Sequence, residues 1–321
     1  MPSDTATTEE QGTTMRSWTV GDIRITQVLE MPVEVGVLDG LIAEATPEVV
    51  QGIGWLHPDY ATAGGQTIWS LHSYVVDTGS AVVVVDTGCG NGKSAPLIPA
   101  WGKLDNPFLE RLAEAGYTRE QVDVVLCTHM HLDHVGWNTV DDGGRWVPTF
   151  PNARYVYVAD EFAYHQGIAE EADISDDLAG AVVYEGANPD IHNQTRLVFA
   201  ESIQPVVDAG LLDLVPADHV VTEGVRYVST PGHTKSHHSV VVESKGERAF
   251  ITGDFIHHPV QIAEPTWSSH GDFDRAQSAA RRVEFVESAA DTDLLVLGTH
   301  FAGTSAGRVV RDGGGYRFAP A

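Results

Sequence analysis

The densest group of potential metal ligands in this chain of 321 residues is the run Thr128-His129-Met130-His131-Leu132-Asp133-His134. Three imidazoles and a carboxylate this close together would be costly to bury without a partner, and a divalent cation supplies one. His129 and His131 lie two residues apart, so in an extended segment they point the same way, whereas Asp133 and His134 can face a second ion. The apolar flanks VVLC and VGW favour this metal site over a solvated, histidine-rich loop.

Three further residues of metal-ligand type follow short apolar strands. Gly232-His233 comes after RYVSTP, Gly253-Asp254 after AFIT, and Gly298-Thr299-His300 after LLVL. A single histidine behind a strand is usually structural, but three such positions besides the first motif are hard to attribute to chance. Loops at strand ends often carry functional side chains on a rigid scaffold. We therefore expect all of these residues to converge on one site.

Taken together, the residues resemble the signature of the metallo-β-lactamase superfamily, which reads HxHxDH, then Gly-His, Gly-Asp and a final His. The strand that ends in Val85-Asp86-Thr87-Gly88 is similar to the first motif of that superfamily. The resemblance extends from about Trp18 to Phe318. It implies an α/β (α+β) fold in which two mixed β-sheets form an αβ/βα sandwich flanked by helices.

The resemblance also implies a ligand set for two divalent ions. The first ion would bind three histidines, the second an aspartate and two histidines, and one aspartate would bridge them. In that order the expected ligands are His129, His131 and His233, then Asp133, His134 and His300, and finally Asp254. Asp86 and His237 would hold the ligands in orientation. Imidazole and carboxylate ligands without a thiolate suit Zn²⁺, and Fe²⁺, Mn²⁺ or Co²⁺ could occupy the same sites.

Within the superfamily, the chain best matches the group of N-acyl homoserine lactonases and methyl parathion hydrolase. The matching strings are PVVDAGLLDLV, TPGHTKSHHSV, GDFIHHPVQ and GTHFAGTSAGRVVRDGGGYRF. Lys235 and Ser236 replace the Pro and Gly of the usual GHTPGH, and His257 stands where the lactonases usually place a tyrosine, as in the methyl parathion hydrolase-like branch. The resemblance implies a dinuclear hydrolase that cleaves a lactone or ester with a hydroxide shared by the two ions. A phosphotriesterase is the alternative.

In such a mechanism Asp133 would accept or pass on a proton, and Asp254 would orient the ions. His257 would donate a hydrogen bond to the substrate oxygen or the leaving group, and the adjacent His258 is expected to face away. Aromatic residues in nearby loops are candidates for the pocket wall. We expect that wall to include Trp55, Trp137, Phe255 and Trp267.

A hypothesis from another class is an oxidoreductase similar to the persulfide dioxygenases, with a single iron. Such an enzyme needs one His-His-Asp set with open positions and no second metal site. The chain retains Asp133, His134 and His300, which would hold a second ion, and this favours the hydrolase. Metal content would separate the hypotheses, because one predicts two zinc-like ions in each chain and the other predicts one iron.

Short apolar strands and a few helices must position these residues. We predict strand pairs around Gly21-Asp22 and Gly79-Ser80, and buried strands over 122–128, 153–159 and 293–299, with others at VRYVST, HSVVVES and RAFITG. We predict helices after an Asn106 cap followed by Pro107, over 160–166, and over 274–288 with Asp274 as its cap. Adjacent hairpins mixed with strand–helix alternation favour two sheets with helices outside over a doubly wound parallel sheet.

Two segments lack a clear hydrophobic period. Residues 31–68 are rich in Gly and Pro, which favours a binding loop or lid, and residues 169–195 are acidic, which favours an insertion over the surface. Residues 1–15 lack the basic start and apolar centre of a secretory signal. We therefore expect a disordered tail there, a single catalytic domain over 16–321, and a cytoplasmic protein. Surface or loop positions are expected for His57, His72, His165, His192, His219 and His270.

The composition disfavours several classes of binding partner. With 19 Lys and Arg against 45 Asp and Glu, the formal net charge is −26, which disfavours nucleic acids and anionic membranes. No apolar run approaches the ~20 residues that span a bilayer. The two cysteines cannot form a disulfide framework; Cys127 is expected to pack in its strand and Cys89 to lie in a loop. We expect a small-molecule substrate, no nucleic acid or membrane partner, and a homodimer as the oligomeric state to test.

Overall fold

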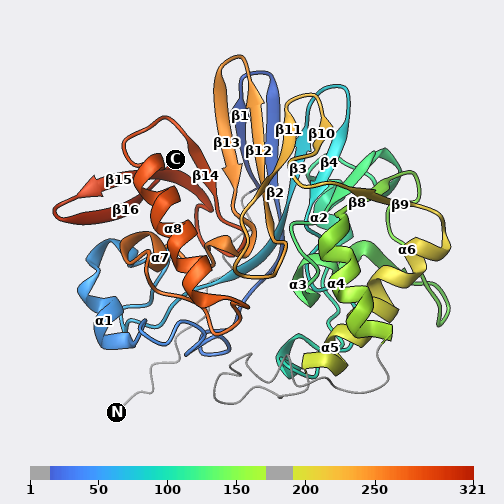
Figure 1. Cartoon of the computed structure of the whole chain (residues 1–321), viewed down its shortest axis with the longest axis horizontal. Helices are drawn as coiled ribbons and strands as arrows, with labels where there is room; N and C mark the ends of the chain where they lie inside the picture. Colours follow the sequence, from blue (N-terminus) through green and yellow to red (C-terminus); the bar gives the residue numbers. More distant parts are fainter. Residues whose placement is uncertain (1–14, 171–190) are drawn as a thin grey trace, which may run out of the picture.

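The computed structural model describes residues 15–170 and 191–321 (Figure 1). The predicted tail over 1–15 lies outside the described residues apart from Met15, which is exposed. The 171–190 part of the predicted acidic insertion also lies outside them. At the far end of that segment the prediction is wrong, because residues 191–195 belong to a helix that buries His192 and Gln194.

Two mixed, seven-stranded sheets form the centre of the molecule. The first sheet runs in the order β1 (Arg16–Val20), β2 (Ile23–Pro32), β3 (Ser70–Asp77), β4 (Val82–Val85), β5 (Val124–Leu126), β8 (Arg154–Val158) and β9 (Leu212–Val215). The second runs in the order β10 (Val220–Thr222), β11 (Val225–Ser229), β12 (His238–Ser244), β13 (Glu247–Ile251), β14 (Leu295–Leu297), β15 (Ala306–Asp312) and β16 (Gly315–Pro320). The parallel pairs are β4–β5, β5–β8, β8–β9 and β13–β14. A separate small sheet pairs β6 (Thr139–Asp141) with β7 (Trp146–Pro148).

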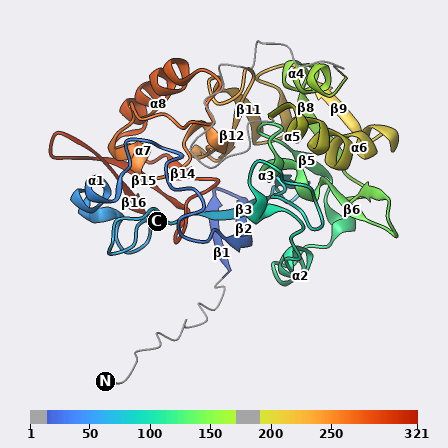
Figure 2. The same ribbon diagram turned by 90° about the horizontal axis from the view of Figure 1, so that it is seen from below.

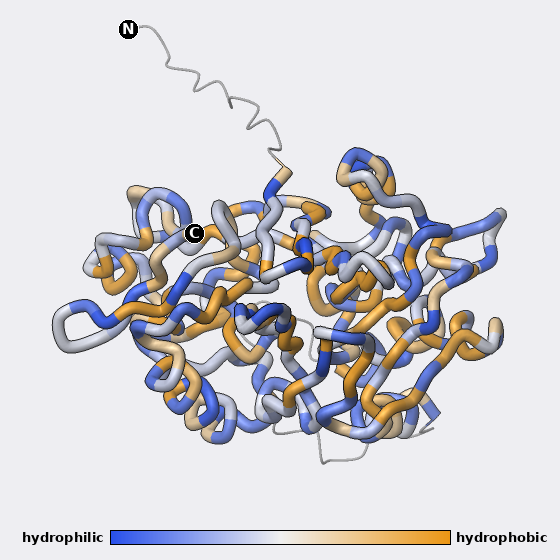
Figure 3. Tube along the Cα trace, turned by 90° about the horizontal axis from the view of Figure 1, so that it is seen from above, coloured by the Kyte–Doolittle hydropathy of each residue, from blue (hydrophilic) through white to orange (hydrophobic). Residues whose placement is uncertain are grey.

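Alternation along the valine-rich strands divides the core between the two faces of each sheet. Val83 of β4 and Val240 of β12 pack together in the layer between the sheets. Their chain neighbours Val84 and Val241 pack in the two outer layers instead. The continuous apolar runs of the sequence are therefore strands buried on both faces. In Figure 3 hydrophobic residues follow these strands, whereas hydrophilic residues gather at turns and outer loops.

Helices cover the outer face of each sheet (Figures 1 and 2). The first sheet is covered by α2 (Phe108–Glu114), α3 (Leu132–Val135), α4 (Ala159–Glu170), α5 (Ile191–Val198) and α6 (Gln204–Asp208), and the second by α1 (Pro47–Gly52), α7 (Val260–Ala263) and α8 (Arg275–Ala289). This arrangement confirms the predicted αβ/βα sandwich. No helix within 15–170 and 191–321 is long and apolar enough to cross a membrane.

Most predicted strands and helices are confirmed in place, including the cap of α8, where the Asp274 carboxylate accepts a hydrogen bond from Gln277 N at 2.9 Å. The predicted Asn106 cap is wrong. Pro107 occupies the cap position of α2, and the Asn106 side chain is turned away to donate to Met31 Sδ, while the backbone of Asn106 bonds the Asn91 amide. The helix predicted over 160–166 extends to Glu170. The strands β6, β7, β9, β10, β15 and β16 were not predicted, and most of them are short or largely polar.

The segment over 31–68 is less irregular than its composition suggests. It contains α1 and a single helical turn over Gly54–Leu56. It also buries Ile42 and Tyr60 in the outer core of the second sheet. Leu38 of this segment lines the cavity described below, which agrees with the predicted binding loop. A lid movement stays a prediction.

Candidate metal centre

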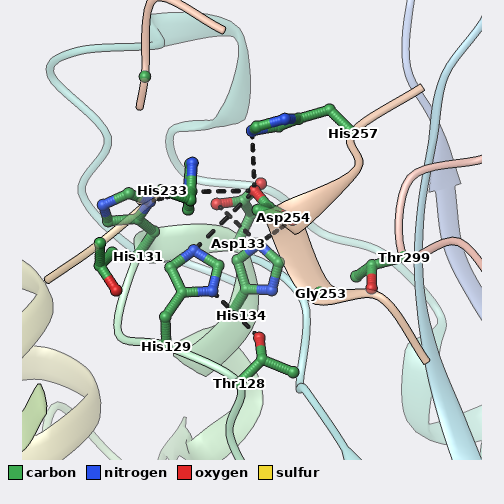
Figure 4. Close-up of polar contacts among 12 residues, drawn as sticks. Thr128, His129, His131, Asp133, His134, His233, Gly253, Asp254, His257 and Thr299 are labelled. Carbon is green, nitrogen blue, oxygen red and sulfur yellow. Dashed lines mark hydrogen bonds and ion pairs between the residues drawn. The ribbon is translucent and has the colours of Figure 1, made fainter. Parts of the chain in front are cut away.

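Four loops that follow strands of the two sheets bring the seven predicted ligands together. Figure 4 labels all of them except His300. The loop after β5 carries the run from His129 to His134, and the loop after β11 carries His233. Asp254 lies in a single turn after β13, and His300 follows β14. The ligand atoms of His129, His131 and His233 lie within 4.8 Å of one another, as do those of Asp133, His134, Asp254 and His300.

One oxygen of the Asp254 carboxylate, Oδ2, faces the first histidine group. It lies 3.5 Å from Nε2 of His233 and 3.9 Å from Nε2 of His129. Nε2 of His233 is in turn 3.0 Å from Nδ1 of His131. Three ring nitrogens from two different loops therefore gather on this side of the carboxylate.

The other oxygen, Oδ1, faces the second group. It lies 3.3 Å from Nε2 of His134 and 2.9 Å from Nε2 of His300. The Asp133 carboxylate closes this group, with oxygens 3.7 Å from Nε2 of His134 and 3.6 Å from Nε2 of His300. Asp254 thus stands between two ligand groups, and each group faces a different oxygen.

The unsatisfied polar atoms of the cluster test whether cations fit it. Within the described parts of the chain, Nε2 of His129, Nε2 of His134 and Oδ1 of Asp254 are buried and have no hydrogen-bond partner. Ring nitrogens that crowd a carboxylate without donating to it are arranged as lone-pair ligands around a cation would be. Imidazole and carboxylate without thiolate is a donor set that divalent cations such as Zn²⁺ accept. The residues present therefore fit the predicted metal ions.

The electrostatics differ between the two ligand groups. Burial lowers the pKa of His129 and of His131 well below the usual range, so both rings are neutral. Burial alone would raise the pKa of Asp254, but the neighbouring imidazoles, His134 first, outweigh burial and hold it well below its usual value. Burial would also lower the pKa of His134 and of His300, but the carboxylates, Asp254 first, outweigh burial and raise both values above the usual range. A cation that binds the second group would therefore displace protons from these rings.

Asp86 and His237 have the orienting positions that the resemblance implies. The Asp86 carboxylate accepts hydrogen bonds from Thr128 N at 2.8 Å and Thr128 Oγ1 at 2.9 Å, and it lies 3.0 Å from Nδ1 of His134. Nε2 of His237 accepts a hydrogen bond from Asp254 N at 3.0 Å. Gly253 has a φ of +56°, and a Cβ there would lie 2.5 Å from Nε2 of His237, so only glycine fits this turn.

Of the two adjacent histidines, His257 faces the site and His258 faces away. Nε2 of His257 lies 3.6 Å from Oδ2 of Asp254, and burial lowers the pKa of His257 to about 3. His258 is instead held between the carbonyl of Tyr60 and the backbone N–H of Val260. The structure thus agrees with the predicted orientations, and the role of His257 as a donor stays a prediction.

Two buried carboxylates that the sequence analysis missed also touch the site. Asp272 Oδ1 lies 3.0 Å from Nδ1 of His233, on the side of the ring away from Asp254. Glu161 accepts hydrogen bonds from Met130 N, between His129 and His131, and from Thr234, which follows His233. No spacing rule could have found them, because each partner is distant in the sequence and meets the carboxylate only in the folded chain.

A cavity of about 240 Å³ opens on the ligand cluster. His131, Asp133, His233, Asp254, His257 and His300 form one part of its wall. The rest is mainly apolar and includes Leu38, Leu41, Trp69, Leu97, Ile98, Trp101, Met130, Leu132, Ile168, Val198 and Phe273. A cavity of this kind suits a small organic molecule.

The four aromatic residues predicted for the pocket do not line this cavity. Trp137 stacks on Phe108, with ring centroids 5.2 Å apart, and its Nε1 donates a hydrogen bond to Glu30 at 2.7 Å. Trp55 packs against the edge of Tyr60 in the outer core of the second sheet. Both rings therefore serve the packing of loops behind the site.

Phe255 and Trp267 are also directed into the outer core of the second sheet. The Phe255 ring meets Phe285 of α8 at a centroid distance of 5.3 Å. Trp267 is half-buried against the same core. The tryptophans that do line the cavity are Trp69 and Trp101, whose sequence surroundings are no different in kind.

Several histidines expected at the surface are buried. His72 in β3, His165 in α4 and His192 in α5 are all less than 5% exposed, because each lies on the inward face of a regular element. His165 and the half-buried loop residue His270 line the cavity. The remaining two, His57 and His219, lie at exposed and half-buried loop positions as predicted. Cys89 and Cys127 are both buried and unpaired.

Residues 68–300 match the family model described as the Metallo-beta-lactamase superfamily. The chain is 26% identical over 218 residues to an atrochrysone carboxyl ACP thioesterase from Passalora fulva, covering 67% of this chain and 45% of that protein. It is 23% identical over 184 residues to an N-acyl homoserine lactonase from a Bacillus species, covering 54% of this chain and 58% of that one. The chain thus spans about half the length of the curated relatives it matches.

Solved structures resemble the whole fold. The hydrolase AbOPH of the beta lactamase superfamily superposes with a TM-score of 0.76 at 22% identity, over 96% of this chain and 97% of that one. AidC, a dizinc quorum-quenching lactonase in complex with its product N-hexnoyl-L-homoserine, superposes with a TM-score of 0.74 at 19% identity and the same coverage. At these identities the likeness is one of fold.

Proposed function

The chain belongs to the metallo-β-lactamase superfamily, and on that premise we propose that it is a dinuclear, metal-dependent hydrolase of lactones or esters. One observation carries this proposal. The two oxygens of the Asp254 carboxylate face two separate ligand groups, with His233 on one side and His300 on the other. A carboxylate placed in this way can contact two cations at once.

The proposed ligands are His129, His131 and His233 for the first cation and Asp133, His134 and His300 for the second, with Asp254 shared. Two divalent cations bound there would polarise a substrate oxygen and bring the pKa of a bound water toward ~7. Zn²⁺ is the cation that we expect, because the donor set contains only imidazole and carboxylate. Asp133 is half-buried at the cavity wall, where it can accept a proton from the site.

His257 is the group that we assign to the reacting oxygen of the substrate. It lines the cavity and its Nε2 lies 3.6 Å from Oδ2 of Asp254. Its Nδ1 is buried without a hydrogen-bond partner among the described residues. A neutral imidazole in this position can donate one hydrogen bond toward an oxygen that becomes negative during the reaction.

The cavity wall favours a substrate with an apolar body. Two polar side chains of the wall are already engaged within the protein: the Thr234 hydroxyl donates to Glu161, and the Gln194 amide bonds Ser94 O and Leu97 N. The remaining surface near them is largely aliphatic or aromatic. Burial of an acyl, alkyl or aryl group against that surface would supply affinity by the hydrophobic effect.

A phosphotriesterase is the second candidate. The observation that favours it is His257, which stands where the lactonases that the chain resembles usually place a tyrosine. An imidazole donor can serve a phosphoryl oxygen as well as a carbonyl oxygen, and the same two cations would serve both reactions.

A substrate panel tests the proposal. Purified full-length protein, stripped of metal and reloaded with Zn²⁺, is assayed on alkyl lactones, N-acyl homoserine lactones, aryl esters and phosphotriesters. We expect hydrolysis of lactones or esters that a chelator abolishes and Zn²⁺ restores. Turnover of phosphotriesters alone would favour the second candidate. One iron in each chain of the protein as purified, before metal is removed, together with oxygen consumption in the presence of a persulfide, would replace both candidates with the oxidoreductase.

A further inference from the structure

Glu161 is a buried carboxylate at the back of the ligand cluster, and the proposed chemistry assigns it no task. It lies in the first turn of α4 and is 2% exposed. A charged side chain this deeply buried is costly unless hydrogen bonds satisfy it. Its partners therefore indicate what it does for the protein.

The partners of Glu161 come from two loops that belong to different sheets. Oε1 accepts a hydrogen bond from Met130 N at 3.4 Å, in the loop after β5. Oε2 accepts one from Thr234 Oγ1 at 2.8 Å and one from Ser236 N at 3.3 Å, in the loop after β11. The same carboxylate lies 3.5 Å from Nδ1 of His165, one turn further along α4.

These two loops hold the first ligand group. Met130 stands between His129 and His131, and Thr234 directly follows His233. The carboxylate therefore ties together both backbone segments from which the three histidines project. The second group has no such contact in the described ranges, since none of the hydrogen bonds of Glu161 reaches Asp133, His134 or His300.

We propose that Glu161 is a positioning residue that holds the β5 and β11 loops at the separation that the first cation requires. This inference rests on the proposed binding of two cations. Loss of a hydrogen bond that orients a metal ligand typically weakens metal binding by ~10–100-fold. Glu161 bonds the backbone between His129 and His131 and the residues that follow His233, and none of these hydrogen bonds reaches a residue next to Asp133, His134 or His300. Its replacement therefore weakens the first cation and spares the second.

Variants that retain one ligand group make this selectivity measurable. His300→Ala removes a ligand of the second group only, and His131→Ala removes a ligand of the first group only. Glu161→Gln is introduced into each background, and Zn²⁺ affinity is measured by competition with a chromophoric chelator. Asp160→Asn, at the exposed neighbouring position of the same helical turn, is the matched control.

In the His300→Ala background we expect Glu161→Gln to raise the Zn²⁺ dissociation constant by ~10–100-fold. In the His131→Ala background we expect no change, and Asp160→Asn should change neither. Thr234→Val, which removes only the hydroxyl donor, should give a smaller loss with the same selectivity. Thr234→Val also replaces Glu161→Gln as the test variant if Glu161→Gln does not fold.

Equal weakening in both backgrounds would show that Glu161 stabilises the fold in general, and no weakening in either would show that the loops do not need it. Both results overturn the inference. The experiment measures Zn²⁺ affinity and not turnover. If Glu161→Gln weakens only the first cation but the protein hydrolyses no substrate, the proposed function is contradicted and the inference about Glu161 stands.

Discussion

Asp254 and Glu30 are both buried carboxylates, but their oxygens meet opposite kinds of atoms. The oxygens of Glu30 accept hydrogen bonds from Cys89 N at 2.8 Å, Gly90 N at 3.0 Å and Trp137 Nε1 at 2.7 Å. The oxygens of Asp254 face ring nitrogens of five histidines between 2.9 and 3.9 Å, yet Oδ1 has no hydrogen-bond partner within the described ranges.

The difference separates a structural polar cluster from a metal centre. Three N–H groups compensate Glu30, so the carboxylate holds the loop behind Asp86 without any further partner. The histidines around Asp254 are buried and crowded, and burial keeps the rings of His129 and His131 in the first group neutral, so these two rings can offer lone pairs. A buried carboxylate oxygen that is crowded by imidazoles and has no hydrogen-bond partner among the described residues is placed as a ligand of a cation would be. Burial alone therefore does not identify a functional carboxylate. Whether its neighbours are N–H donors or potential metal ligands distinguishes the two cases.

Removal of the Asp254 charge should have the largest effect. Asp254→Asn keeps the shape of the side chain and loses the oxygen charge shared by both groups. We expect both cations to bind more weakly and turnover to fall by roughly 10³-fold or more, since metal ions supply several kcal/mol of charge stabilisation. The metal content of the purified variant measures the loss of cations, and kcat/KM on the best substrate of the panel measures the loss of turnover.

Glu30→Gln is the matched control, because it also neutralises one buried carboxylate. It should retain both cations and most of the turnover. Full activity in Asp254→Asn, or equal metal loss in the two variants, would remove the distinction between the two carboxylates.

The His257 side chain should have the next largest effect. His257→Ala removes the proposed donor and no proposed ligand, so we expect kcat to fall by ~10²-fold with unchanged metal content. The loss should be greater for esters with poor leaving groups, which need protonation. His258→Ala, which alters the neighbour that faces away, should change kcat much less. Loss of a cation in His257→Ala would instead show that His257 is a ligand.

Glu30 should influence stability rather than turnover. Burial, opposed by its three N–H donors, raises the pKa of Glu30 from 4.5 to about 7. The folded state therefore holds a proton that the unfolded state releases, and this stabilisation is present below pH 4.5 and lost as the pH rises through about 7. Between these pH values the free energy of unfolding of the wild type should fall by on the order of 3 kcal/mol relative to that of Glu30→Gln. Urea unfolding of both proteins at pH 5 and pH 8 measures the difference, and parallel curves would contradict it.

The ligand positions could be predicted because each follows a short apolar strand. His233, Asp254 and His300 carry a local signal, a strand followed by glycine and a ligand, and loops at one end of two packed sheets must converge. The αβ/βα arrangement could be predicted for a related reason, since runs such as Val82–Val85 require burial on both faces.

The surroundings of the ligands could not be predicted in the same way. Glu161 and Asp272 reach their partners only through tertiary contacts, and no local pattern records such a contact. An aromatic residue in a loop gives no sign of which side it faces: Trp137 turns toward Phe108 and Glu30, whereas Trp101 turns toward the cavity. His165 looked like a surface residue because α4 has a weak apolar face, yet it is buried beside His131.

The central claim is that two divalent cations bind on either side of the Asp254 carboxylate. Anomalous scattering at the zinc absorption edge, from crystals of the Zn²⁺-loaded protein, tests it most directly. The account predicts two anomalous peaks in each chain, one between Asp254, His129, His131 and His233 and the other between Asp254, Asp133, His134 and His300. A single peak, or peaks that do not contact Asp254, would contradict it.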